Sequence, residues 1–158
     1  MKNEMLVLFV LLLGIIGCKD KPTVNTAVET ELTENFDFLI GDWKRTNDDE
    51  GKATYEHWNK KAQSYGGTGY TMQGLDTIWQ EEMILFENMQ DWYLSITGAH
   101  DTVATNFLVT EIREGYFKCQ NPDNEFPKVI EYGAVDNQLN ASVSAGKDTI
   151  SFSFVPIN

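Results

Sequence analysis

The feature that most constrains this chain is an alternation of apolar and polar residues, which runs from residue 41 almost to the C-terminus. It is clearest in residues 92–97, 139–145 and 149–154, where one face of the chain is apolar throughout. A period of two residues is typical of β-strands with one apolar side and one side that faces water or a ligand. No long stretch of helical period interrupts the pattern, so we expect an all-β domain.

Short polar or glycine-containing segments divide the alternating runs into strands. They read NDDEG, QG, AHD, REG, DN and GKD, and residues of these types favour turns. This spacing predicts an antiparallel up-and-down β-barrel of about 8–10 strands. Closure removes the two edges of an open sheet, and a barrel of this size has room for one small ligand. Ahead of the strands, Phe36, Leu39 and Ile40 have helical spacing and predict one short helical turn.

The N-terminus carries a cation at Lys2 and then an uncharged apolar run over residues 5–16. These twelve residues suit the apolar part of a signal peptide and are fewer than the roughly 20 that span a bilayer as a helix. Residues 15–18, Ile-Ile-Gly-Cys, resemble the lipobox of bacterial lipoproteins. The resemblance implies cleavage before Cys18 and lipidation of Cys18, with enough acyl chains for stable anchoring. A secreted protein cut elsewhere and an uncleaved membrane segment are the alternatives.

Residues 19–35 are polar and rich in threonine, so they cannot bury enough apolar surface to fold. The predicted organisation is a signal peptide at 1–17, the lipidated cysteine and a flexible tether at 18–35, and the barrel at 36–158. Lys19 follows the cysteine, and no aspartate stands at that position. In bacteria with two membranes, lipoproteins that resemble this one are usually sent to the outer membrane. We therefore expect an outer-membrane lipoprotein of the cell envelope that faces the periplasm.

The formal net charge of the chain is −12 at pH 7. Such acidity argues against nucleic acid and against an anionic membrane face as partners, and it favours solubility. Once Cys18 carries lipid, Cys119 is the remaining cysteine and no internal disulfide can form. Because Cys119 stands in a strand-like run without a neighbouring histidine, we expect an unreactive buried thiol. A monomer is expected.

Four blocks of the chain resemble one known family. FDFLIGDWKR, YEHW, QEEMILF and FKCQNPDNEFPKVIEY are similar to successive blocks of the bacterial lipocalin-like domain family DUF6265, whose function is unknown. Members carry Gly-x-Trp at the start of the first strand, Glu-x-Trp in the second, and Asn-Pro-x-His-Asp-Phe-Pro late in the chain. The matching positions are Gly41, Trp43, Glu56, Trp58, Asn121, Pro122, Phe126 and Pro127. The resemblance covers residues 36–146 and implies a lipocalin-like barrel.

The chain departs from the family pattern at Asn124 and Glu125, where members have His-Asp. Asparagine can donate and accept hydrogen bonds, but it cannot transfer protons near neutral pH or ligate a metal as imidazole does. Residues 121–127 therefore have two interpretations. They form a structural bend in which Asn121 caps a turn stiffened by prolines, or they contact a ligand.

A looser resemblance is to the haem-binding nitrobindin barrels, which also begin with a Gly-x-Trp strand. Those barrels need a proximal histidine late in the chain, whereas the histidines here are His57 and His100, so we expect no haem. No CxxC, HExxH or histidine cluster predicts a metal site. The glycines of YGGTGYTMQG do not fit a phosphate-binding loop and are better interpreted as small residues at a crowded bend of the barrel. No cofactor is expected.

Residues 52–58 give the strongest indication of a binding site. Thr54, Glu56 and Trp58 share one face, and neither face of this strand is purely apolar. Such a strand lines a polar and aromatic cavity or lies near the mouth of a barrel. We predict that the barrel binds a small hydrophobic or amphipathic molecule. The predicted ligand-binding residues are Trp43, Glu56, Trp58, Glu82, Asn121 and Glu125, whereas Trp92 shares a face with Leu94 and Ile96 and is expected in the core.

Two other functions stay open. One is a non-catalytic scaffold or interaction protein of the envelope, whose barrel is filled by its own side chains. The other is a hydrolase or isomerase that uses interior carboxylates. It requires two coupled carboxyl groups with strongly shifted pKa values in a cleft. The carboxylates considered are Glu56, Glu81, Glu82 and Glu125, but such candidates mean little in a chain with 24 acidic residues. No nucleophile-elbow motif predicts a Ser-His-Asp triad, and no catalytic residue is assigned.

Overall fold

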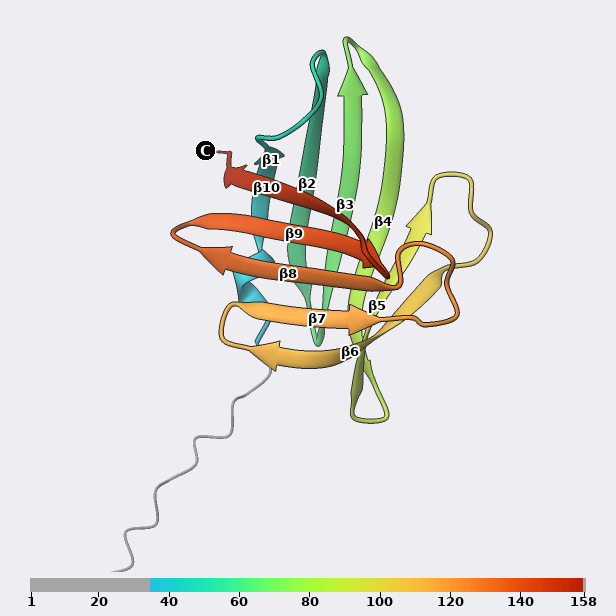
Figure 1. Ribbon diagram of the computed structural model, residues 1–158. Helices are drawn as coiled ribbons and strands as arrows, with labels where there is room; N and C mark the ends of the chain where they lie inside the picture. The colour runs from blue at the N-terminus through green and yellow to red at the C-terminus, as the bar shows by residue number, and fades with distance from the viewer. Residues whose placement is uncertain (1–34, 158) are drawn as a thin grey trace, which may run out of the picture. The chain divides into compact units, whose positions relative to one another are not determined.

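The computed structural model describes residues 35–157, which form ten antiparallel strands closed into one barrel (Figure 1). A single 3-10 turn, η1 (Asp37–Leu39), precedes the strands. The strands are β1 (Gly41–Arg45), β2 (Lys52–Lys61), β3 (Ser64–Gln73), β4 (Asp76–Asn88), β5 (Asp91–Gly98), β6 (Thr105–Arg113), β7 (Tyr116–Gln120), β8 (Val129–Val135), β9 (Gln138–Ala145) and β10 (Asp148–Pro156). The predicted all-β, up-and-down barrel with a short N-terminal helical turn is confirmed.

The predicted signal peptide, Cys18 and nearly all of the predicted tether lie outside the described residues. Within residues 35–157, no helix has the length and apolar character needed to cross a membrane.

Each strand pairs with its neighbour in sequence, and β1 closes the barrel against β10. In this closing seam Trp43 pairs with Pro156 and Arg45 pairs with Phe154. The seam is extended by a backbone hydrogen bond from the Thr46 amide to the Ser153 carbonyl, 2.8 Å long. Each of the ten strands therefore has a hydrogen-bonded neighbour on both sides.

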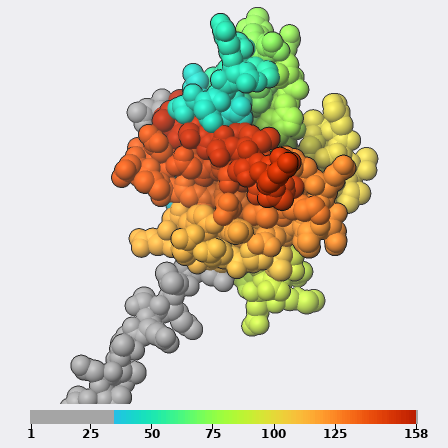
Figure 2. Space-filling model, viewed as in Figure 1, coloured from blue at the N-terminus to red at the C-terminus, as the bar shows by residue number. Residues whose placement is uncertain are grey.

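The wall is continuous over β8, β9 and β10 when viewed from the side shown in Figure 2. The strands β2, β3 and β4 are the longest group of neighbours in the barrel, with 10, 10 and 13 residues. Their upper hairpin projects beyond this wall (Figures 1 and 2).

The sequence alternation separates the interior of the barrel from its outer face. In β2, Thr54, Glu56 and Trp58 are buried in the interior. Between them, Tyr55 stacks on Tyr70 of β3 with ring centroids 5.2 Å apart on the outer face. The face predicted for residues 52–58 is therefore the interior face.

One end of the barrel is closed by η1 and its flanking residues. Phe36 and Leu39 are fully buried, and the Phe36 ring lies 4.8 Å from the ring centroid of Trp92 and 5.5 Å from that of Phe117. Asp37 fixes the turn, because its Oδ1 accepts hydrogen bonds from Lys60 Nζ at 2.7 Å and from the Tyr65 hydroxyl at 2.6 Å. The closed end is defined here as this half of the barrel interior, filled by Phe36, Leu39, Trp43, Trp58, Tyr65, Leu85, Trp92, Leu94, Phe117 and Leu139.

Tight packing at the closed end explains one of the glycines of β3. A Cβ placed on Gly67 would lie 2.9 Å from the indole ring of Trp58, which is shorter than a normal contact. The interpretation of these glycines as small residues at a crowded position is therefore confirmed at Gly67. Cys119 is buried and unpaired among the described residues, and burial raises the pKa of its thiol, in keeping with the predicted unreactive side chain.

Candidate functional site

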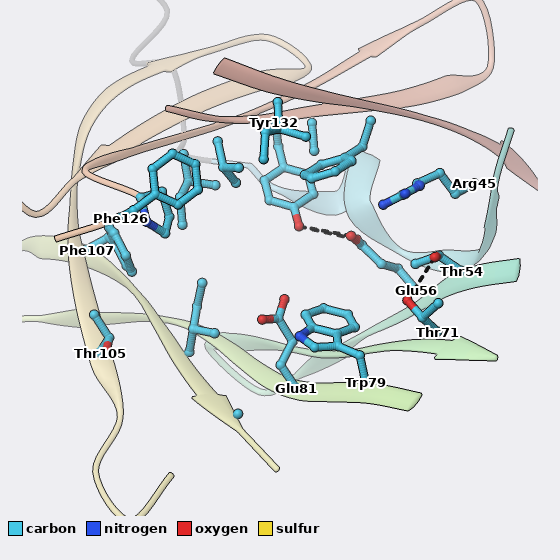
Figure 3. Close-up of a pocket in the computed structure, with 18 of the residues that line it drawn as sticks. Arg45, Thr54, Glu56, Thr71, Trp79, Glu81, Thr105, Phe107, Phe126 and Tyr132 are labelled. Carbon is cyan, nitrogen blue, oxygen red and sulfur yellow. Dashed lines mark hydrogen bonds between the residues drawn. The ribbon is translucent and has the colours of Figure 1, made fainter. Parts of the chain in front are cut away.

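The other half of the barrel interior is hollow. It contains a cavity of about 540 Å³, which lies within the range of about 300–1,000 Å³ typical of small-molecule sites (Figure 3). One side of the cavity is apolar and largely aromatic. The main apolar lining residues are Trp79, Ile96, Phe107, Phe126, Ile130, Val143 and Phe152.

Two carboxylates reach the cavity from strands that flank β3. Glu56 on β2 pairs in register with Gly69 on β3, and Gly69 pairs on its other side with Glu81 on β4. The two glutamates are thus level with each other at a separation of two strand spacings, about 10 Å between Cα atoms. Because Gly69 has no side chain, the space between them is left to the Glu81 side chain and the Trp79 ring. Figure 3 shows both carboxylates directed into the cavity.

Glu56 is held by two donors at the floor of the cavity. Trp58 Nε1 donates to Oε2 at 2.8 Å, and the Tyr132 hydroxyl donates to Oε1 at 3.2 Å. The Tyr132 ring packs edge-on against Trp58, with centroids 5.8 Å apart, so both donors are fixed by the packed core beneath them. Burial raises the pKa of Glu56 to about 7, and the two hydrogen bonds only partly oppose this shift.

Glu81 has a different environment. Burial raises its pKa to about 7, and the negative charge of Glu56 contributes to the same shift. No described residue donates a hydrogen bond that lowers its pKa. Both carboxyl groups therefore titrate near neutral pH, and Glu81 lacks a donor.

The only cation on the cavity wall among the described residues is Arg45, and it is already paired. Arg45 Nε lies 2.8 Å from Asp48 Oδ1, and its guanidinium lies over the Phe152 ring at 4.8 Å from the centroid. Asp48 is held in turn by Thr54, which donates its hydroxyl at 2.6 Å and its backbone amide at 2.7 Å. Asp48 thus offsets part of the Arg45 charge, while Arg45 still lowers the pKa of Glu56.

The β7–β8 loop, residues 121–128, forms part of the cavity mouth. Asn121 Oδ1 accepts hydrogen bonds from the amides of Asp123 at 3.0 Å and Asn124 at 3.1 Å, while its Nδ2 donates to the Asn106 carbonyl. Asn124 Nδ2 donates to the Pro127 carbonyl at 2.7 Å. Asn121 thus caps the turn as predicted, and Asn124, Phe126 and Pro127 of the same segment line the cavity, so the ligand-contacting interpretation stays open as well.

No family model and no curated protein matches this chain. The resemblance to the DUF6265 family therefore stays a prediction. Among the described residues, no group of three or more His, Cys, Asp and Glu side chains is arranged to hold a metal ion. His57 lies on the outer face, with Nδ1 2.6 Å from Asp42 Oδ1.

The cavity contains one of the six predicted ligand-binding residues, Glu56. Trp58 touches the site only through its bond to Glu56, since it is 1% exposed and packed in the closed end. Trp43 is also packed there, where its Nε1 donates to the Leu39 carbonyl at 2.8 Å. Both indoles are core residues rather than cavity walls, because η1 fills the half of the barrel in which they lie.

The other three predicted residues do not line the cavity. Glu82 is exposed on the outer face, so the carboxylate that β4 contributes is its neighbour Glu81. Glu125 is exposed, and Asn121 supports the loop from beneath without lining the cavity.

Sequence reasoning missed Tyr132 and the aromatic wall. Tyr132 shares a face with Ile130 in an alternating run, so its inward direction could have been found from this pattern. Glu81 could not be distinguished from Glu82 in this way. The run Met83–Ile84–Leu85–Phe86 is apolar on both faces, so the pattern does not fix which face of β4 is interior.

Proposed function

We propose that this protein binds a small amphipathic molecule inside the barrel. The observation that carries the proposal is the cavity of about 540 Å³, whose apolar wall faces a small polar group formed by Glu56, Glu81 and Tyr132. Cavities of this composition are typical of ligand sites, because the apolar wall supplies affinity and the few polar groups fix orientation. A ligand would place its apolar body against Phe107 and Phe152 and its polar end at the carboxylates.

The cavity favours ligand binding over the alternative of a scaffold with a filled barrel. We further propose that the protein is a lipoprotein anchored at Cys18 to the outer membrane and facing the periplasm, on the strength of the lipobox resemblance. Asn35, where residues 1–34 join the described part, adjoins η1 at the closed end. The cavity lies in the other half of the barrel interior.

A second candidate is acid–base catalysis, favoured by one specific observation. Glu56 and Glu81 flank Gly69 in the same cavity, and burial raises the pKa of both to about 7. A carboxyl pair of this kind can supply a general base and a general acid near neutral pH, as an isomerase or hydrolase requires. Ligand binding is the simpler proposal because it needs the cavity alone.

Native mass spectrometry of the full-length chain, purified in mild detergent from its own host, tests the binding proposal. We expect a co-purified small molecule that is lost in the variant Ala141→Phe, because a phenylalanine at this cavity-lining position would occupy the ligand space. The matched control is Glu82→Gln on the outer face, which should retain the molecule. The scaffold alternative would be favoured if no molecule were found and no lipid or metabolite in a panel raised the melting temperature.

A further inference from the structure

The ligand's polar end can be assigned a charge. Resting on the binding function proposed above, we infer that the cavity takes a hydrophobic amine, whose protonated amino group lies between Glu56 and Glu81 while its apolar body contacts the aromatic wall.

The first argument is the balance of charge around the cavity. Three carboxylates line it, from Glu56 on β2, Glu81 on β4 and Asp101 in the β5–β6 loop, against the one cation Arg45 on β1. Asp48 Oδ1 lies 2.8 Å from Arg45 Nε and offsets part of the Arg45 charge, which still lowers the pKa of Glu56 slightly. Asp101 is occupied by the Gly98 amide, which donates to its Oδ2 at 2.9 Å. The field inside the cavity is therefore negative and favours a cation over an anion.

Tyr132 does not alter this balance. Burial and the nearby carboxylates raise the pKa of its hydroxyl well above the ordinary value, so the group stays neutral and acts as a donor to Glu56. The titratable groups that face the pair are thus Arg45, Asp101 and Tyr132, and none of them supplies an unpaired positive charge.

The second argument is the missing donor at Glu81. Glu56 receives hydrogen bonds from Trp58 and Tyr132, whereas no described residue supplies one that stabilises the Glu81 carboxylate. The Glu81 carboxylate is partly buried at the cavity wall, so a ligand that supplies a donor in place of water gains affinity there. An ammonium group has three N–H donors and no acceptor. It can therefore donate hydrogen bonds to Glu81 and to a remaining lone pair of Glu56 at the same time.

The third argument is the shared register of the two glutamates. Both are register partners of Gly69, so their side chains enter the cavity at the same level. The position directly above Gly69 is taken by the Trp79 ring and Glu81 Cγ, which lie 3.4 Å and 3.5 Å from a Cβ placed there. A small cationic group in the cavity beside this position would meet two carboxylates and an aromatic ring, and aromatic rings attract ammonium groups.

The apolar wall requires that the amine carry a hydrophobic body. Phe107, Phe126 and Phe152 line the cavity, and Figure 3 shows Phe107 and Phe126 across it from Glu56. A strongly hydrated, fully polar cation would gain nothing from this surface, whereas a naphthyl-sized body would bury its apolar area against it.

The inference also predicts the effect of pH. The pKa of both Glu56 and Glu81 is raised to about 7, so the pair is largely protonated at pH 6 and largely ionised at pH 8. A cation binds the ionised pair more tightly, so its affinity rises with pH and binding releases protons. A neutral ligand of the same shape lacks this dependence.

The experiment compares three probes of one shape, 1-naphthylmethylamine, 1-naphthylmethanol and 1-naphthoate, by titration calorimetry with the full-length chain in a nonionic detergent. Each probe is also titrated into detergent alone. At pH 8 we expect the amine to bind at least tenfold more tightly than the alcohol and the naphthoate to bind most weakly. At pH 6 the advantage of the amine should shrink several-fold.

Matched variants locate the effect. Glu81→Gln should weaken binding of the amine at least tenfold and leave that of the alcohol within about twofold, whereas Glu82→Gln, one residue along on the outer face, should change neither. An alcohol or naphthoate that bound as tightly as the amine in the unmodified protein would overturn the inference and leave the binding function intact. Failure of all three probes to bind would overturn both.

Discussion

Gly69 is the residue that makes one site out of two carboxylates. A side chain at this position would project into the space between Glu56 and Glu81, where the Trp79 ring and Glu81 Cγ already lie within 3.5 Å of its Cβ position. Because residue 69 has no side chain, the two carboxyl groups share one cavity, where each interacts with the other and has few contacts with water. Their raised pKa values follow from this local arrangement, because burial is the largest cause for both.

The raised pKa of Glu81 predicts how stability depends on pH. A carboxyl whose pKa is about 7 in the folded chain and 4.5 in the unfolded chain binds more protons when folded. Its stabilising contribution is therefore full below pH 4.5 and is lost as the pH rises through 7. Glu81→Gln should raise the free energy of unfolding at pH 8 by roughly 1–2 kcal/mol relative to the unmodified protein, with little change at pH 4.5. Urea unfolding followed by tryptophan fluorescence measures both values.

Glu82→Gln is the control for this prediction, because Glu82 is exposed on the outer face of the same strand. The Glu82→Gln variant should show the same difference in free energy of unfolding between pH 8 and pH 4.5 as the unmodified protein. Equal effects of the two substitutions at pH 8 would mean that Glu81 is not buried as described.

At the scale of the elements, β2 and β3 make a close packing contact, in which the Trp58 indole of β2 lies against Gly67 of β3. Gly67→Ala would place a Cβ 2.9 Å from the Trp58 indole, which cannot move because it is 1% exposed in the closed end. We expect a loss of about 1–3 kcal/mol in the free energy of unfolding, as is usual when an extra methyl group is forced into a packed core. Thermal and urea unfolding provide the measurement.

Gly66→Ala tests whether the loss comes from this contact or from any alanine in β3. Its Cβ would meet Lys61 Cε and Nζ at 3.3 Å, at the flexible end of a long side chain. This variant should unfold within about 0.5 kcal/mol of the unmodified protein. A similar loss for both glycines would contradict the packing argument.

The turn η1 makes the second prediction at this scale. Phe36 is fully buried against Trp92 and Phe117, so Phe36→Ala should lower the free energy of unfolding by about 3–5 kcal/mol. Ile40→Ala, in the same segment but at a side chain that is 42% exposed, should cost much less. Unfolding in urea distinguishes the two, and comparable losses would show that η1 does not seal the barrel.

The elements also show what the sequence can and cannot predict. β5, β9 and β10 alternate cleanly, so their interior faces could be assigned, and Phe36 and Leu39 indicated a helical turn. The position of the cavity along the barrel could not be predicted. It depends on which end η1 fills, and this contact between distant parts of the chain leaves no periodic pattern. Because η1 packs into the closed end, Trp43 and Trp58 belong to the core and not to the cavity wall.

At the scale of the described barrel, the interior has a packed half and a hollow half. A single strand can contribute residues to both halves. In β5, Leu94 is fully buried in the closed end, whereas Ile96 and Gly98 line the cavity. Packing density governs local stability, because opening a densely packed region exposes more apolar surface. The two ends of a single strand should therefore differ in stability.

Hydrogen exchange measured residue by residue tests this difference. We expect the amides of Leu85 and Leu94 to exchange only through global unfolding, and those of Ile96 and Glu81, at the hollow end of the same two strands, to exchange about ten- to a thousandfold faster through local opening. All four residues have register partners on both sides, but Ile96 is the last residue of β5 that pairs with β6, so only differences much larger than strand-end fraying test the packing argument. A bound ligand should slow exchange at the hollow end alone, because it fills the missing volume there. Uniform protection along β4 and β5 without ligand would mean that the hollow half is as firmly held as the packed half, and that the cavity is a rigid feature of the wall.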